Sequence, residues 1–237
     1  MSNAERRKQI IVLLQKQPSL SIRDLAAQLY ASEASVRRDV AALEEEGLVR
    51  RIYGGVMLCS SENHIVPLSL RAGDHGAQKE RLAKHAAELV EDGDTILLDA
   101  SSTVYRMVRH LASRKDLTII TNNARIFDES VSLSARIYCT GGEYLRQNHA
   151  FAGSSAEAFL RTIWADKVFF SSQAVSALGE VSDHSEMETA LRRVMLERSA
   201  QKICLMDDSK FGRQCRFRLC AAEDVDLFLS EKKPPWQ

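Results

Sequence analysis

The sequence predicts an α/β protein in two parts, a small helical domain followed by a larger domain built on a mostly parallel sheet. The first 58 residues hold three helix-type apolar stripes and then two short apolar runs around a Gly-Gly pair. Further along, strand-length apolar runs alternate with helical stretches, a pattern typical of a parallel sheet with helices on both faces. We therefore expect domains at residues 1–58 and 77–237, joined by a connector over residues 59–76.

Composition and charge limit the class of protein. Lys plus Arg and Asp plus Glu both number 32 in 237 residues, so the formal net charge is zero. A neutral chain does not coat nucleic acid or membranes through bulk charge, although it can carry a local basic face. The sequence holds no run of 18 apolar residues, and residues 1–8 lack the apolar core of a signal peptide. We expect no contact with membranes and a place in the cytoplasm.

The cysteines do not predict a metal or disulfide site. There are five, and none forms a C-x-x-C pair. An odd count without that spacing is not typical of zinc ribbons or disulfide frameworks. We expect reduced thiols, no metal and no cofactor. The cysteines are Cys59, Cys139, Cys204, Cys215 and Cys220.

The first domain is predicted to contain three helices and a hairpin. Ser21 is a plausible N-cap for the second helix, and Ser32 for the third. The third helix stops at Gly47, because glycine commonly ends helices. Gly54-Gly55 then separates two apolar runs, as in a hairpin. Three helices with a tight second turn and a following hairpin make a winged helix-turn-helix.

The third helix of such a domain presents its outer face to the major groove of DNA. Arginine suits that face because it makes bidentate contacts with guanine and also clamps phosphate. On the wing, contact with backbone phosphate is the expected role. The residues expected at the DNA are Ser21, Ser32, Glu33, Ser35, Arg37, Arg38, Arg50, Arg51 and Tyr53. The alternative is that Arg37 and Arg38 are solvated charges paired with Glu33 or Glu44.

Acidic residues of the third helix are expected to avoid DNA. Asp39 would repel phosphate, so it is predicted to brace an arginine or the turn. The run Glu44–Glu46 is predicted to be a solvated helix end that faces away from phosphate.

Small polar residues follow three predicted strands of the second domain. Asp99 and Ser101–Thr103 follow the first strand and open a helix, Thr121-Asn122 ends the second, and Gly141-Gly142 follows the third. Ligands of open parallel sheets bind outside the carboxyl ends of the strands, and helix N-termini favour anions. We therefore expect a pocket for a phosphorylated polar ligand, although the first segment taken alone is more often a simple helix cap and the third more often a turn. Lys210, after a later strand, either neutralises a phosphate or is an exposed loop lysine.

The sequence resembles the DeoR family of bacterial transcriptional regulators over nearly its whole length. In the first domain the resemblance lies in Ser35–Val40, Leu43–Arg51 and Gly54-Gly55. In the second it lies in Gly93–Asp99, Thr121-Asn122, Gly141-Gly142, Gly153, Asp166, Glu188, Arg192–Met195 and Asp208–Gly212. Three segments depart from the family pattern. The family often has a glycine near Ala31, commonly has Gly-Thr-Thr in place of Ser101–Thr103, and commonly has glycine within the stretch corresponding to Ser171–Ala174.

The resemblance implies a fold for the second domain and a function for the chain. The implied fold is similar to that of ribose-phosphate isomerases and CoA-transferase-like proteins. The implied function is a repressor of a carbohydrate-metabolism operon, with double-stranded operator DNA as partner and a phosphorylated sugar or sugar derivative as effector. The implied effector contacts are Asp99, Ser101, Ser102, Thr103, Thr121, Asn122, Gly141, Gly142 and Lys210. We expect a homodimer or homotetramer, because helix-turn-helix proteins usually read two half-sites.

Two other functions remain open at this point. One is a sugar-phosphate isomerase-like enzyme with an accessory DNA-binding domain. Isomerisation needs a positioned acid–base group, for which Asp99 is a candidate without an evident partner carboxylate or lysine. The other is an architectural DNA-binding protein whose second domain only oligomerises. We expect a regulator with no catalytic residue.

Overall fold

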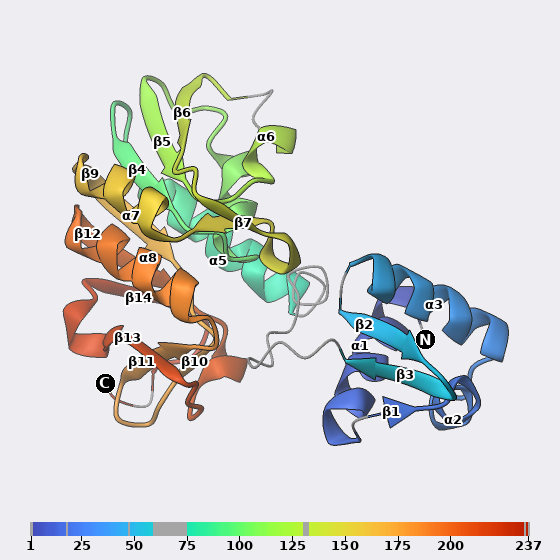
Figure 1. The fold of residues 1–237 in the computed structure, drawn as a ribbon. Coiled ribbons are helices and arrows are strands. Elements are labelled where there is room, and N and C mark those ends of the chain that lie inside the picture. Colours follow the sequence, from blue (N-terminus) through green and yellow to red (C-terminus); the bar gives the residue numbers. More distant parts are fainter. Residues whose placement is uncertain are drawn as a thin grey trace. The chain divides into compact units, whose positions relative to one another are not determined.

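The computed structural model describes residues 2–17, 19–46, 48–58, 75–129, 133–234 and 236. They fall into two compact units, Met1–Asp74 and His75–Gln237, and each is treated by itself (Figure 1). The predicted helix end at Gly47 and the thiol of Cys59 lie outside the described residues. So does the predicted connector, apart from its last two residues, where Gly76 begins a helix. The predicted domain limits at residues 58 and 77 therefore stay predictions.

The described part of the first unit packs helices against a small antiparallel sheet. Its elements are α1 (Asn3–Lys16), β1 (Ser19–Leu20), α2 (Ile22–Gln28), α3 (Glu33–Glu45), β2 (Val49–Ile52) and β3 (Gly55–Leu58). The strand β3 lies between β1 and β2 and is antiparallel to both. Buried apolar residues from all three helices and from the sheet share one core. The predicted winged helix-turn-helix is therefore confirmed.

Both predicted N-caps are confirmed. The Ser21 hydroxyl accepts a hydrogen bond from the Asp24 N–H at 3.0 Å. The Ser32 hydroxyl accepts one from the Ser35 N–H at 3.2 Å. Each cap satisfies an N–H group that the first turn of the helix leaves without an intrahelical partner.

The two glycines of the hairpin are required for different reasons. Ile52 pairs with Gly55, so Tyr53 and Gly54 alone form the turn, and Gly54 has a φ of +88°. That conformation favours glycine. A Cβ on Gly55 would lie 2.5 Å from the Leu20 carbonyl oxygen. The second glycine is therefore what allows β1 to approach β3.

The turn between α2 and α3 holds an unexpected residue in a glycine-like conformation. The DeoR family often has a glycine near Ala31, and this chain has none there. In the structure, Tyr30 has a φ of 49°, in the left-handed region, and its side chain is 99% exposed. The residue of this turn that adopts the left-handed conformation is therefore Tyr30 and not Ala31.

The second unit is built on a six-stranded sheet in which every neighbouring pair is parallel. In spatial order the strands are β14 (Leu227–Leu229), β12 (Ser199–Leu205), β9 (Ala165–Phe170), β4 (Thr95–Leu98), β5 (Leu117–Thr121) and β6 (Ala135–Cys139). The predicted α/β fold with a mostly parallel sheet is confirmed.

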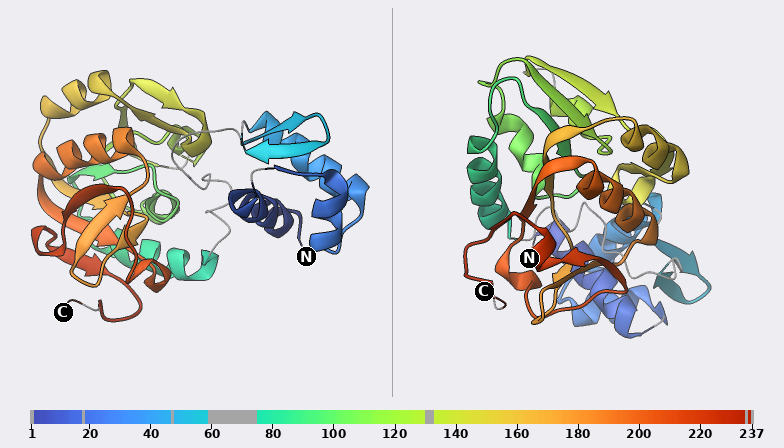
Figure 2. Two further views of the ribbon diagram at one scale, coloured as in Figure 1. Left: turned by 60° about the horizontal axis from the view of Figure 1, so that its bottom comes forward. Right: turned by 90° about the vertical axis from the view of Figure 1, so that its left-hand side faces the viewer.

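Helices cover both faces of this sheet, as both views in Figure 2 show. On one face, α5 (Gly76–Glu88) and the 3-10 helix η1 (Val104–His110) pack with Ile96 and Leu98. On the other, α7 (Ser154–Arg161) and α8 (Glu186–Glu197) pack with Leu97. Alternate residues of β4 thus serve opposite layers, as the two-residue period of a strand requires.

Smaller elements surround the strand ends. An antiparallel sheet combines β10 (Ala174–Val175), β11 (Glu180–Asp183) and β13 (Phe217–Ala221). A hairpin combines β7 (Glu143–Leu145) and β8 (Ala150–Ala152). The remaining helical turns are α6 (Ile126–Glu129), η3 (Arg146–Asn148), η4 (Asp208–Lys210) and η5 (Ala222–Asp224). Within the described ranges, no helix has both the length and the apolar character that a membrane span needs.

Candidate nucleic-acid interface and ligand site

The exposed face of α3 holds the two arginines predicted to meet DNA. The Arg37 guanidinium lies 2.9 Å from the Glu33 carboxylate, one helical turn away. The Arg38 guanidinium donates to the Ser35 hydroxyl at 3.4 Å. The predicted alternative pairing of Arg37 with Glu33 is therefore present. Such an exposed pair contributes only about 0.3–0.5 kcal/mol, so it does not prevent Arg37 from turning to a base or a phosphate.

The wing is joined to α3 through Arg51. Its N–H donates to the Glu44 carboxylate at 2.9 Å, and its guanidinium lies 3.3 Å from the same carboxylate. Glu44 is exposed, as predicted for this helix end, and it also pairs with the wing, which the sequence interpretation did not include. Glu46 likewise lies 3.6 Å from Arg7. Arg50, on the other face of β2 by strand alternation, and Tyr53, at the turn, are exposed.

Asp39 braces an arginine, as predicted. It is buried, and its carboxylate lies 2.5 Å from Arg6 Nε and 3.5 Å from Arg7 Nε. Both arginines belong to α1, so the contact fixes α1 against the inner side of α3.

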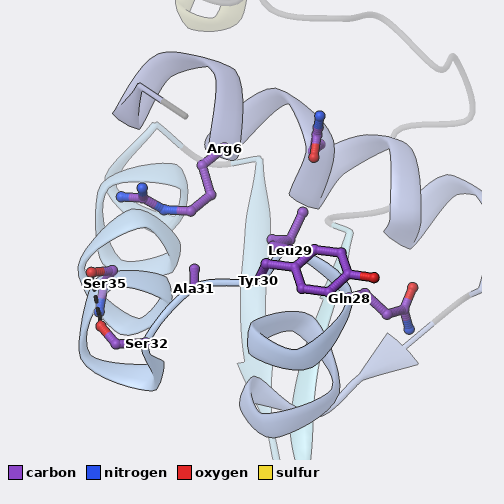
Figure 3. Close-up of a pocket in the computed structure, with 8 residues that line it drawn as sticks. Arg6, Gln28, Leu29, Tyr30, Ala31, Ser32 and Ser35 are labelled. Carbon is purple, nitrogen blue, oxygen red and sulfur yellow. Dashed lines mark hydrogen bonds between the residues drawn. The ribbon is translucent and has the colours of Figure 1, made fainter.

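A hollow of about 520 Å³ lies beside the start of α3 (Figure 3). Its walls come from α1 and from the turn between α2 and α3. The lining residues are Arg6, Gln9, Gln28, Leu29, Tyr30, Ala31, Ser32 and Ser35.

Of the residues predicted to contact DNA, the structure brings those of α3 together with Arg51, which contacts Glu44 and the Arg37 carbonyl. Ser21, Arg50 and Tyr53 stand on separate elements of the same unit.

In the second unit, the parallel strands bring the predicted polar segments to one edge of the sheet. The chain adds β5 and β6 on one side of β4, and then β9, β12 and β14 on the other. The sheet order therefore reverses between β4 and β9, the position at which ligands of such sheets bind. Asp99 follows β4 at this point, and Ser171 follows β9.

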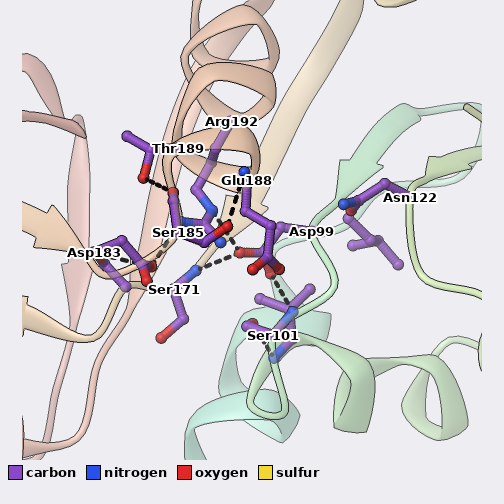
Figure 4. A network of polar contacts seen from close by, with 12 residues as sticks. Asp99, Ser101, Asn122, Ser171, Asp183, Ser185, Glu188, Thr189 and Arg192 are labelled. Atoms are coloured by element: carbon purple, nitrogen blue, oxygen red, sulfur yellow. Dashed lines mark hydrogen bonds and ion pairs between the residues drawn. The ribbon is translucent and has the colours of Figure 1, made fainter. Parts of the chain in front are cut away.

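Asp99 is held by three donors in a buried network (Figure 4). One carboxylate oxygen accepts from the Ser101 N–H at 3.0 Å. The other accepts from the Ser171 N–H at 3.1 Å and from Arg192 Nε at 3.0 Å. The Arg192 guanidinium also donates to Asp183 at 2.9 Å. Asp99 therefore joins the ends of β4 and β9 to α8, and its contact with a ligand stays a prediction.

Arg192 organises this network, and the sequence interpretation leaves it without a role. Burial by itself would lower the pKa of its guanidinium, but the carboxylates of Asp183, Asp99 and Glu188 raise that pKa above its ordinary value. Arg192 thus stays charged. The available signal is the spacing of Glu188 and Arg192 by four residues, on a helix face that otherwise carries apolar residues.

The segment after β4 acts partly as a cap. The Ser101 hydroxyl accepts from the Val104 N–H at 3.2 Å, as the simpler interpretation predicts. The helix that follows, η1, is a 3-10 helix of seven residues, and the attraction of an anion to its start stays a prediction. Ser102 and Thr103 are buried. Within the described residues, the Thr103 hydroxyl has no hydrogen-bond partner.

The residues at the ends of β5 and β6 contact β4 and the β7–β8 hairpin. The Thr121 hydroxyl donates to the Leu98 carbonyl at 2.7 Å. The Asn122 amide donates to the Phe151 carbonyl at 3.0 Å, while its own side-chain oxygen is buried and has no partner among the described residues. Gly141 and Gly142 have φ values of +64° and +101°. A Cβ on Gly142 would lie 2.5 Å from the Ala152 carbonyl oxygen, so this glycine is needed by the hairpin.

Lys210 reaches the same edge from the end of β12. Its ammonium donates to the Ser171 hydroxyl at 3.0 Å and lies 3.8 Å from the Asp207 carboxylate. The side chain is 16% exposed, so Lys210 is not an exposed loop lysine. It shares Ser171 with Asp99, which places a positive charge beside the reversal point of the sheet. No group of three His, Cys, Asp or Glu suited to a metal ion occurs in the described ranges.

Comparison with known proteins gives matches to both units. A model of the DeoR-like helix-turn-helix domain matches residues 6–62, and a model of the DeoR C terminal sensor domain matches residues 74–232. The transcriptional repressor AccR of Agrobacterium fabrum is 32% identical over 232 residues, which are 97% of this chain and 90% of that protein. The lactose phosphotransferase system repressor of Staphylococcus epidermidis is 30% identical over 235 residues, 98% of this chain and 93% of that one.

Solved structures give a weaker likeness. Ribose 5-phosphate isomerase A of Methanocaldococcus jannaschii superposes with a TM-score of 0.44 and 17% identity, over 58% of this chain and 55% of that chain. A likeness of this size is too weak to support a statement about chemistry.

Proposed function

Since the chain belongs to the DeoR family of transcriptional regulators, we propose that it represses a carbohydrate-metabolism operon and that a phosphorylated sugar or sugar derivative controls its binding to DNA. We place this activity in the cytoplasm. We propose a homodimer or homotetramer, because an operator with two half-sites is bound by two helix-turn-helix domains. The name of one relative, a repressor of a lactose phosphotransferase system, supports a link to sugar metabolism.

The arrangement of α3 and the wing supports the DNA-binding half of this proposal. Arg37 and Arg38 project from the exposed face of α3, while buried Asp39 fixes the opposite side of that helix to α1. The link from Arg51 to Glu44 holds the wing beside α3. We assign base contacts to Arg37 and Arg38, and phosphate contacts to Arg50, Arg51 and Tyr53. Ser21, Ser32, Glu33 and Ser35 lie at helix N-termini, where they orient the backbone toward DNA.

The hydrogen bond between Lys210 and Ser171 is the main support for the proposed binding of an effector. In our proposal the Lys210 ammonium binds the effector phosphate, and Ser171 orients the ammonium through their 3.0 Å contact. Thr103 and Asn122 offer buried oxygens that lack partners among the described residues and suit sugar hydroxyls. Ser102 lies beside Thr103. Asp99, Ser101, Thr121, Gly141 and Gly142 support the site, because their polar groups or backbone conformations already serve the fold.

We propose that the second unit binds its effector without converting it. The acid–base candidate Asp99 is occupied by Arg192 and two backbone N–H groups, which leaves no free carboxylate for proton transfer at that position. The effector acts instead by mass action. A ligand that favours one arrangement of the oligomer shifts the population between arrangements that bind DNA and arrangements that do not.

A thermal-shift screen against sugar phosphates tests the effector half. A compound that binds only the folded state raises the melting temperature as its concentration rises. The rise in melting temperature caused by the ligand is expected to be smaller in Lys210→Ala and in Thr103→Val than in the unmutated protein. A flat response across a broad set of sugar phosphates would support an architectural protein whose second domain only oligomerises. Turnover of a sugar phosphate that disappears in Asp99→Asn would support an isomerase instead.

A further inference from the structure

The turn that holds Lys210 has little support of its own. It is η4, a 3-10 helix of three residues, closed by backbone hydrogen bonds of 3.2 Å from the Lys210 N–H to Asp207 and from the Phe211 N–H to Asp208. Helical turns this short are marginal unless other parts of the protein pack on them. The position of the Lys210 ammonium therefore depends on what contacts Asp208 and Phe211.

The last residues of the chain make two of those contacts, beside a hydrogen bond of 3.5 Å from the Gln78 amide to Asp208 and a parallel bridge between Phe211 and Val175. We call residues 230–234 and 236 the C-terminal segment. Lys232 forms an ion pair with Asp208, at one end of the turn. The Trp236 ring packs edge-on against Phe211, at the other end, with 5.6 Å between ring centroids. The two contacts hold the turn from both sides.

The C-terminal segment is itself anchored to the body of the second unit. Trp236 also packs edge-on against Phe228 of β14, with centroids 5.2 Å apart. A Cβ on Gly179 would lie 3.4 Å from the Trp236 ring, so the indole rests close over that glycine. Glu231 forms an ion pair with Arg81 of α5. The segment thus connects the Lys210 turn to three separate elements.

We propose that the C-terminal segment positions Lys210 for the effector phosphate, and that Trp236 reports whether the site is occupied. This inference rests on the proposed effector site. Because the turn and the segment pack as one body, a phosphate bound to Lys210 stabilises the packing of Trp236. By the reciprocity of linked equilibria, the packing of Trp236 raises the affinity for that phosphate by the same factor. Lys232 and Trp236 are therefore positioning residues, which do not touch the effector.

Hydrogen exchange of the full-length protein tests the positioning without any ligand. Trp236→Ala is expected to raise the exchange of amides in residues 207–213 by about tenfold, which corresponds to the loss of two edge-on aromatic contacts. Trp236→Phe should restore protection, because it keeps an aromatic ring, and Lys232→Arg should do the same for Lys232→Ala. Trp164→Phe is the matched control, since Trp164 is 58% exposed and packs near Arg198 instead. Unchanged exchange in Trp236→Ala would overturn the inference, whatever the DNA-binding result.

Fluorescence titration with inorganic phosphate tests the link to the ligand. In the Trp164→Phe background, Trp236 is the remaining tryptophan of the chain. Its emission should change on addition of phosphate, and Lys210→Ala should abolish the change. Lys232→Ala should weaken phosphate binding several-fold, and Lys232→Arg should restore it. Raised exchange with unaltered phosphate affinity would overturn the inference, because the turn would then be packed without positioning Lys210. Absence of phosphate binding to the unmutated protein by calorimetry would instead contradict the proposed effector site, whereas binding by calorimetry without a change in Trp236 emission would overturn the inference.

Discussion

Arg192 donates from Nε to the Asp99 carboxylate at 3.0 Å, across 93 positions of the chain, and both side chains are buried. The same guanidinium reaches Asp183. One buried cation thus holds two carboxylates at the reversal point of the sheet. Loss of the cation would leave both carboxylates buried and unpaired.

We predict that Arg192→Ala destabilises the second unit by about 3–5 kcal/mol, the usual effect of breaking a buried ion pair. Arg193→Ala is the matched control, because Arg193 is the next residue of α8 and is exposed. It should change the stability by less than about 1 kcal/mol. Denaturation followed by the fluorescence of Trp164 and Trp236, both in the second unit, measures the two effects. Equal midpoints for the two variants would contradict the role given to Arg192.

Asp207 predicts a pH dependence of stability. Burial by itself would raise the pKa of its carboxyl group, but Lys210, Ser209, Lys79 and His75 lower that pKa below its ordinary value. A pKa that is lower in the folded state stabilises the protein above the unfolded pKa of about 3.9, and this stabilisation is lost as the pH falls through the folded value.

Denaturation midpoints measured from about pH 6 down to about pH 2.5 check this prediction. The unmutated protein should lose stability steeply at the acidic end. Asp207→Asn should lose less over that range, because it has no proton to take up. Parallel curves for the two proteins would show that Asp207 does not contribute.

The first unit predicts two kinds of DNA-binding defect. Arg38→Ala should weaken binding to a preferred site by about tenfold or more and reduce discrimination between sites, because it removes a base contact. Arg50→Ala should weaken binding to all sequences alike and reduce the dependence on salt by about one unit of slope, because it removes a phosphate contact. Fluorescence anisotropy at several salt concentrations separates the two. Lys16→Ala, at the end of α1, is the control. If Arg38→Ala and Arg50→Ala weaken binding equally at every sequence, the assignment is wrong.

Tyr30 predicts a mutation that stabilises the helix-turn-helix. Replacement by glycine removes the cost of a left-handed tyrosine, which is about 1–2 kcal/mol, and only part of this is offset by the greater freedom of the unfolded chain. Tyr30→Gly should therefore slow the amide exchange of α2 and α3. Tyr30→Val, with a β-branched side chain at the same φ, should accelerate it. Faster exchange in the glycine variant would show that the Tyr30 side chain stabilises the turn.

Much of the fold could be predicted because its signals are local. Ser21 and Ser32 cap helices within three residues of themselves, and the Gly54-Gly55 pair marks a hairpin between two adjacent apolar runs. The alternation of apolar runs predicts the parallel sheet, and from it the meeting of strand ends on one edge. These features depend on spacing, which the sequence displays directly.

The features that escaped prediction depend on contacts and conformations that follow no periodic pattern in the sequence. The two carboxylate partners of Arg192 lie 93 and nine positions away in the sequence. The contact of Glu44 with the wing spans seven positions and shows no periodic signal. The contact of Lys210 with Ser171 joins positions 39 apart. The conformation of Tyr30 is set by the geometry between α2 and α3, which the residue type itself opposes. The meeting of the predicted polar segments at one edge of the sheet thus followed from the sequence, while the contacts that organise them required the structure, and their contact with a ligand stays a prediction.

The most direct test of the central claim is DNA binding by the full-length protein in the absence and presence of sugar phosphates. Fluorescence anisotropy with the DNA upstream of its own gene, against a scrambled duplex of equal length, provides the measurement. We predict selective binding that one or more sugar phosphates change at least about tenfold, or about 1.4 kcal/mol of coupling, with the response lost in Lys210→Ala. Equal affinity for both duplexes at every salt concentration, or selective binding that no sugar phosphate alters, would contradict this account.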